Sequence, residues 1–92
     1  MHEKFEWDSV KVVENIRKHR VSFEEVATVF GDPLALTFDD PDNSDQERRL
    51  LTFGISESER LLIVSHTYRR RHVRIISVRC MDRGERRIYE EG

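Results

Sequence analysis

The amino-acid sequence predicts one α+β domain, in which two N-terminal helices pack on one face of a small antiparallel sheet. Two amphipathic stretches with helix start signals come first, and four apolar stretches joined by short loops follow them. Successive strands with short connections form antiparallel meanders, and helices placed before such a sheet can cover one of its faces. A chain of 92 residues buries only one modest core, so residues 1–92 are predicted to form a single domain.

The first predicted elements are a short strand and a helix. The strand covers Phe5 to Trp7, and Asp8 is a favourable N-cap for a helix that runs to about His19. Trp7 precedes this cap and is placed to pack on Val12 in the first turn.

The second helix has stronger start and stop signals. Ser22 is its predicted N-cap, Glu25 completes a capping box, and Val21 is placed to pack on Val26. Gly31 follows the last apolar residue and ends the helix.

The rest of the chain is predicted as four strands and a short final helix. The acidic stretch at 39–47 is a solvated loop between the first two of these strands. Asp82 and Glu85 have capping-box spacing, and the short helix that they begin must dock on the domain to be stable. The predicted strands cover residues 34–38, 48–55, 60–68 and 72–80. The residues predicted to supply the core are Val26, Val29, Phe30, Leu51, Phe53, Ile63 and Ile76.

Charge is distributed unevenly along the chain, although the net charge is only −2. Residues 21–47 contain eight acidic residues and no lysine or arginine, whereas residues 69–87 contain eight arginines and two acidic residues. Arginine predominates over lysine, and its forked guanidinium group binds phosphate through two hydrogen bonds. The distribution, unlike the net charge, is compatible with a nucleic-acid partner.

The sequence disfavours several classes of protein and site. No apolar run approaches the roughly 20 residues that span a bilayer, so no membrane partner is predicted, and no signal peptide opens the chain. Cys80 is the only cysteine, so no internal disulfide is possible and a reducing cytoplasm is the expected location. Neither metal nor cofactor is predicted, because Cys80 lacks zinc-site spacing to His2, His19 and His66.

Four segments resemble the BrnT family of bacterial toxins: FEWD at 5–8, KHRVSFEEVATVFGDPLALTFDDPD at 18–42, HTYRRRHVRIISVR at 66–79 and RRIYEEG at 86–92. They span nearly the whole chain in the family's order. The resemblance implies a compact RelE-like ribonuclease fold and a metal-independent endoribonuclease that acts on RNA. It also implies a protein partner, a BrnA-type antitoxin with a ribbon-helix-helix domain. The toxin would be associated with DNA only indirectly, through this antitoxin.

Two positions depart from the family's usual pattern. Arg20 stands where the family usually has glycine, and Val78 stands where it usually has alanine. Glycine at position 20 would allow a left-handed helix end, so Arg20 must adopt that conformation at a cost unless the helix ends differently.

His66 is the best candidate for a catalytic base. RNA supplies its own nucleophile, the 2′-hydroxyl group, so cleavage needs a base, positive charge for the phosphorane and an acid for the leaving oxygen. Neighbouring arginines are expected to lower the pKa of His66 and keep it neutral, as a base must be. The alternative is a histidine that is hydrogen-bonded structurally at a strand end.

Arg74 and Arg79 are candidate phosphate ligands, but their spacing raises a problem. The two positions differ by an odd number, so a regular strand directs their side chains to opposite faces. A bulge, a strong twist or a strand end near Ser77 would bring both into one cleft. Without such a feature, one of the two arginines is structural.

The remaining candidates have equally plain structural alternatives. Arg69, Arg70 and Arg71 occupy a predicted hairpin tip, where they either bind the RNA backbone or form a solvated turn. Tyr89 is a candidate catalytic acid or base-stacking platform, or it covers the edge of the core. Lys4 can line the same cleft as an RNA contact if the first strand adds beside the hairpin.

Two functions from different classes are compatible with the basic hairpin. The first is the RNA-cleaving toxin that the resemblance implies. The alternative is a non-catalytic binding module that partners a DNA-binding repressor through the same arginines. Catalysis requires His66 or a substitute for it, whereas electrostatic binding requires only the arginines.

Overall fold

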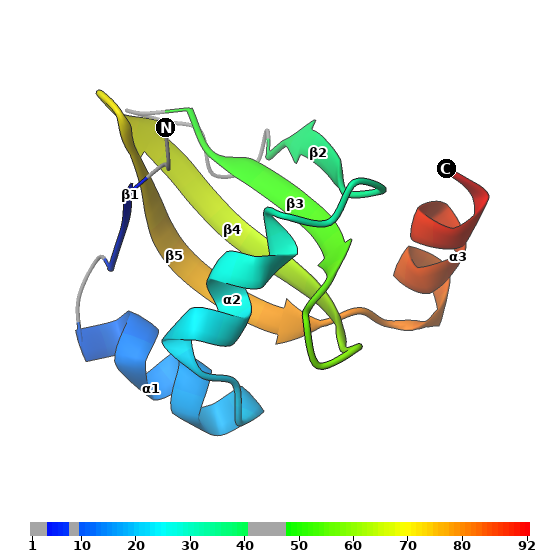
Figure 1. The fold of residues 1–92 in the computed structure, drawn as a ribbon, viewed down its shortest axis with the longest axis horizontal. Helices are drawn as coiled ribbons and strands as arrows, with labels where there is room; N and C mark the ends of the chain where they lie inside the picture. The colour runs from blue at the N-terminus through cyan, green and yellow to red at the C-terminus, as the bar shows by residue number, and fades with distance from the viewer. Residues whose placement is uncertain (1–3, 8–9, 41–47) are drawn as a thin grey trace.

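A computed structural model describes residues 4–7, 10–40 and 48–92 of the chain. In these residues, five strands form one sheet and three helices pack around it (Figure 1). The elements follow one another in the predicted order. They are β1 (Lys4–Trp7), α1 (Val10–His19), α2 (Phe23–Val29), β2 (Leu36–Asp39), β3 (Leu50–Ile55), β4 (Leu61–Arg69), β5 (His72–Cys80) and α3 (Arg83–Glu91).

The sheet is mixed rather than purely antiparallel, which corrects the prediction. The strand order is β1-β5-β4-β3-β2, and β2 to β5 form the expected antiparallel meander. β1 lies beside β5 and runs parallel to it, with Phe5 next to Val73 and Trp7 next to Ile75. The short turns at 56–60 and 70–71 force β3, β4 and β5 to alternate in direction. Two helices separate β1 from the rest of the sheet, so β1 is free of that constraint.

The two faces of the sheet are covered differently. α1 and α2 lie on one face, where α1 contacts β5 and α2 contacts β3 and β4 (Figure 1). The larger core lies under these helices and includes Val26 of α2 and Leu62 of β4. A smaller cluster on the opposite face joins Phe53 and Ile63 to Tyr89 of α3. No helix in the described part of the chain is long and apolar enough to cross a membrane.

Ile76 was wrongly predicted as a core residue because β5 contains a bulge. Ser65 pairs with Ser77, but the next residue of β4 pairs with Ile75, so Ile76 is an extra residue on β5. Ile76 is only half-buried, and Val78 joins the core instead. The other predicted core residues are buried or packed against the buried clusters: Val26, Val29, Phe30, Leu51, Phe53 and Ile63.

The ends of α2 and α3 use the predicted residues, with one difference. Ser22 caps α2 by accepting a hydrogen bond from the backbone N–H of Glu25. The Glu25 carboxylate, however, accepts a hydrogen bond from Ser56 in the β3–β4 turn, so it ties that turn to α2. Asp82 and Glu85 form a complete capping box at the start of α3, as predicted.

Some predicted features near the N-terminus and in the acidic loop lie outside the described residues. These are the N-cap Asp8, the side chain of Val12 and most of the loop at 39–47. Trp7, which was predicted to pack on Val12, packs edge-on against Phe23 of α2, with ring centroids 4.1 Å apart.

α1 ends at a left-handed residue that is not glycine. Arg20 has a φ of 56°, its N–H donates to the carbonyl of Arg17, and the N–H of Val21 donates to the carbonyl of Ile16. These two bonds form a Schellman motif, in which the left-handed position usually holds glycine. Arg20 therefore adopts the conformation that favours glycine, and Arg60 donates a hydrogen bond to its carbonyl.

Candidate functional site

The bulge at Ile76 places Arg74 and Arg79 on the same face of the sheet. Arg74 pairs with Thr67 and Arg79 pairs with Ile63 across the β4–β5 ladder. Side chains alternate along β4, so both partners lie on the face opposite α1 and α2. The bulge is thus the feature that resolves the odd spacing of the two arginines.

One part of this face, formed by β1, β5 and β4, is lined by polar and charged side chains. It consists of Glu6 on β1, His72 and Arg74 on β5, and Thr67 and Arg69 on β4, which we call the polar face. The β-strand registers align these residues in two neighbouring rows across the three strands. The part of the same face that α3 covers is apolar by contrast.

Glu6 lies between an imidazole and a guanidinium group on the polar face. Its Oε2 lies 3.5 Å from Nδ1 of His72, and its Oε1 lies 3.7 Å from Nη1 of Arg74. The side chains of Glu6 and His72 are 38% and 40% exposed, whereas that of Arg74 is 21% exposed. All three groups are therefore accessible to solvent, as a ligand-binding cluster must be.

A hollow of about 580 Å³ lies beside this cluster at the tip of the β4–β5 hairpin. Its lining residues are Glu6, Arg69, Arg70 and His72. Arg70 occupies the turn with a φ of 58°, and both Arg70 and Arg71 are exposed. The backbone of Lys4 is in register with His72, which confirms that β1 adds beside the hairpin, but the Lys4 side chain lies outside the described residues.

Arg79 is held by α3. Its Nη1 and Nη2 each donate a hydrogen bond of 2.6 Å to the Glu85 carboxylate. This two-bonded pair raises the pKa of Arg79 and lowers the pKa of Glu85. Because Glu85 is also part of the α3 capping box, Arg79 connects the end of β5 to the start of α3.

His66 is fully buried on the other side of the sheet, under α2. Its ring packs edge-on against Phe30 with centroids 4.9 Å apart, and its Nε2 lies 2.7 Å from Oγ1 of Thr52. The pKa of His66 is lowered to about 4, but the cause is burial and not neighbouring arginines. The side chain is neutral as predicted, yet it has no exposed surface, so its position favours the structural alternative.

Tyr89 is also engaged in a structural contact. Its hydroxyl group donates to Oδ2 of Asp32 at 2.6 Å, and the same oxygen accepts the backbone N–H of Ile55. Burial and the bond to Asp32 raise the pKa of Tyr89 to about 12, so the phenol retains its proton strongly. Figure 1 shows α3 far from the tip of the β4–β5 hairpin, and the hollow at that tip is lined by Glu6, Arg69, Arg70 and His72 rather than by Tyr89.

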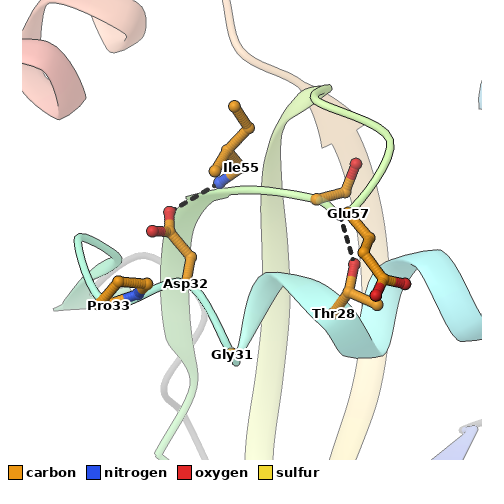
Figure 2. Close-up of a pocket in the computed structure, with 7 residues that line it drawn as sticks. Thr28, Gly31, Asp32, Pro33, Ile55 and Glu57 are labelled. Atoms are coloured by element: carbon orange, nitrogen blue, oxygen red, sulfur yellow. Dashed lines mark hydrogen bonds between the residues drawn. The ribbon is translucent and has the colours of Figure 1, made fainter.

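A second hollow, of about 400 Å³, lies where the end of α2 meets the β3–β4 turn (Figure 2). Asp32 accepts the N–H of Ile55 on one side of it, and Thr28 accepts the N–H of Glu57 on the other. These bonds fasten the turn to α2, and we assign this hollow no chemical role.

Glu6 and His72 are site residues that the sequence did not single out. The alternation of side chains along a strand could have indicated both residues. It directs Glu6 to the face opposite its apolar neighbours and His72 to the same face as Arg74. Their closeness depends on the pairing of β1 with β5, which local patterns do not specify. In the described part of the chain, no group of three or more His, Cys, Asp or Glu side chains is arranged to hold a metal ion.

Residues 7–85 match the family model described as "Ribonuclease toxin, BrnT, of type II toxin-antitoxin system". The matched range includes α1, α2 and the whole of the β2–β5 meander, and therefore Thr67, Arg69, His72 and Arg74 of the polar face. A comparison with curated proteins gave no match. Because the family model covers most of the chain, the protein belongs to the BrnT family of ribonuclease toxins of type II toxin–antitoxin systems.

Proposed function

We propose that the protein is a metal-independent endoribonuclease with a RelE-like fold and that RNA binds on the polar face. The observation that carries this proposal is the cluster of Glu6, His72 and Arg74 beside an arginine-lined hollow. Membership of a ribonuclease toxin family supplies the class of substrate. The polar face supplies the cations and titratable groups that RNA cleavage without a metal ion requires.

The arginines are proposed to have different roles. Arg69, Arg70 and Arg71 lie at or beside the hollow and would attract the RNA backbone without reading its sequence. Lys4, whose backbone pairs with His72, is proposed as a further RNA contact. Arg74 lies deeper and would stabilise the charge of the phosphorane. Arg79 would act mainly as a structural anchor, because Glu85 already occupies its guanidinium group.

The proposed partner is a BrnA-type antitoxin with a ribbon-helix-helix domain, acting together with the toxin in the cytoplasm. Type II systems pair a toxin with a protein antitoxin, and family membership therefore implies such a partner. We propose that the antitoxin covers the polar face with acidic side chains, since charge complementarity would direct it to the same arginines as RNA.

The test is incubation of the purified protein with structured and unstructured RNA in EDTA. We expect cleavage to continue, with products that end in a 2′,3′-cyclic phosphate and a 5′-hydroxyl group, because the attacking group is the RNA's own 2′-hydroxyl. An Arg74→Ala protein purified in parallel controls for contaminating nucleases. Activity that disappears in EDTA and returns with a divalent ion would overturn the metal-independent mechanism.

A non-catalytic binding module is the second candidate, and the burial of His66 favours it. His66 is the only catalytic base that was predicted from the sequence, and in this structure it is buried and cannot reach RNA. If no other group accepts the 2′-hydroxyl proton, the arginines would bind a partner protein instead of stabilising a transition state. The choice between the two functions therefore depends on whether the polar face contains a base.

A further inference from the structure

We infer that His72 is the base that accepts the proton of the RNA 2′-hydroxyl group and that Glu6 is the residue that positions it. This inference rests on the proposed endoribonuclease function and assigns its proton transfer. Of the histidines that the structure describes, His66 is buried and His19 lies at the end of α1, so His72 alone belongs to the polar face.

The contact between Glu6 and His72 favours one tautomer of the imidazole. The Glu6 carboxylate faces Nδ1 at 3.5 Å, so the N–H of the neutral ring is stabilised on Nδ1. Nε2 then carries the lone pair and is the nitrogen that can accept a proton. A carboxylate oriented in this way also stabilises the imidazolium ion that forms during the reaction.

The presence of Glu6 is otherwise unfavourable for an RNA site. A carboxylate repels phosphate, so a surface that only bound the RNA backbone would bind it more tightly without Glu6. Glu6 contacts His72 through one oxygen and Arg74 through the other. It therefore fixes the base and the proposed phosphate ligand relative to each other, which is the role expected of a positioning residue.

The surrounding charges suit the same reaction. Arg69 is the cross-strand neighbour of His72, and Arg74 is two residues along the same strand, so cations lie on two sides of the imidazole. The 2′-hydroxyl proton would pass to Nε2 of His72 as the 2′-oxygen bonds to phosphorus. The bond between phosphorus and the 5′-oxygen then breaks, and that oxygen takes a proton from water. His72 returns its own proton to solvent, so no metal, oxidant or further reactant is needed.

The first test replaces His72 with alanine, with His72→Asn as a second variant of closer size. We expect single-turnover cleavage to slow by about 10²–10⁴-fold, the range for a positioned proton-transfer group. RNA affinity should stay close to that of the wild type. Added imidazole should restore part of the activity of His72→Ala, because a small base can enter the space left by the ring. His19→Ala is the matched control and should neither lose activity nor respond to imidazole.

The second test replaces Glu6 with glutamine. We expect kcat to fall by about tenfold or more, because the imidazole loses its orienting charge. RNA should bind more tightly at the same time, because a repulsive carboxylate has been removed. A residue with a merely structural role would not produce these opposite changes, and Glu6→Asp should recover part of kcat.

The outcomes separate this inference from the proposed function. Wild-type rates in His72→Ala would overturn the inference and leave the endoribonuclease proposal standing. Loss of cleavage without any rescue by imidazole, accompanied by a lower melting temperature in both His72 variants, would show that His72 is structural and would also overturn it. A folded wild-type protein that binds RNA but cuts none would overturn the endoribonuclease proposal, and this inference with it.

Discussion

Arg74 and Arg79 face the same side of the sheet, although they are five residues apart on one strand, because Ile76 is an extra residue between them. Their surroundings nevertheless differ. Arg74 contacts Glu6 on the polar face, whereas Arg79 makes two short hydrogen bonds to Glu85 of α3. One shared face therefore carries two arginines with different expected roles.

Arg79→Ala should reduce stability more than RNA affinity. Its side chain is 49% exposed, so solvent screens the pair with Glu85, and the expected loss is about 1 kcal/mol. Glu85→Ala should cost more, because it also removes half of the α3 capping box. Denaturant unfolding of both single variants and the double variant gives the coupling energy. If RNA affinity falls for Arg79→Ala but not for Glu85→Ala, Arg79 is a phosphate ligand after all.

His66 should make the protein sensitive to acid. Burial lowers its pKa from 6.5 to about 4, so between these pH values the unfolded chain binds a proton that the folded chain does not. Stability should therefore be complete above the unfolded pKa and decrease as the pH falls towards 4, by about 3 kcal/mol in total. His66→Leu should remove this part of the pH dependence, which unfolding curves at several pH values can measure.

The same His66→Leu variant also tests the role that the sequence predicted for this histidine. Because the ring is buried under Phe30, the folded variant should cleave RNA at nearly the wild-type rate. A folded His66→Leu protein without activity would support His66 as the base and contradict the assignment to His72.

Arg20→Gly should stabilise the protein. Arg20 has a φ of 56°, which costs a residue with a side chain about 1 kcal/mol relative to glycine. The hydrogen bond from Arg60 reaches the backbone carbonyl of Arg20, so the substitution retains it. A higher melting temperature is expected, with unchanged cleavage because α1 ends away from the polar face. A lower melting temperature would show that the Arg20 side chain makes a contact that outweighs the strain.

The complex with antitoxin should be inactive. If the antitoxin covers the polar face, RNA and antitoxin compete for the same arginines, and cleavage should decline in proportion to the antitoxin bound. Titration of a fixed amount of toxin against RNA cleavage measures this directly. A saturated complex that cleaves as fast as the free toxin would place the antitoxin on another surface.

Local patterns in the sequence predicted the elements well, because each depends on neighbouring residues. Ser22 and Asp82 cap their helices as expected, and the antiparallel pairing of β3, β4 and β5 follows from the short turns between them. Alternation along β4 also contained the signal that His66 is buried, since it places His66 on the same side as Leu62 and Val64. The arginines that follow His66 in the sequence favoured a catalytic role for it, but they do not alter this periodicity.

The arrangement of the polar face was less predictable, because it depends on contacts between distant parts of the chain. Glu6 and His72 approach each other only because β1 pairs with β5 in parallel. The bulge at Ile76 was one of several solutions to the spacing of Arg74 and Arg79, and no residue type at that position specifies it. Predicting such features requires the pairing register of the whole sheet, which a single sequence does not specify.

The most direct test of the RNA-cleaving polar face compares the single-turnover cleavage rate of Arg74→Ala with that of Arg87→Ala, in EDTA. Both variants lose one arginine, but Arg87 lies exposed on α3, away from the polar face. We expect Arg74→Ala to be slower by about 10²-fold or more, because charge that stabilises the phosphorane is gone. Arg87→Ala should stay near the wild-type rate. Equal rates for the two folded variants would contradict the assignment of RNA cleavage to the polar face.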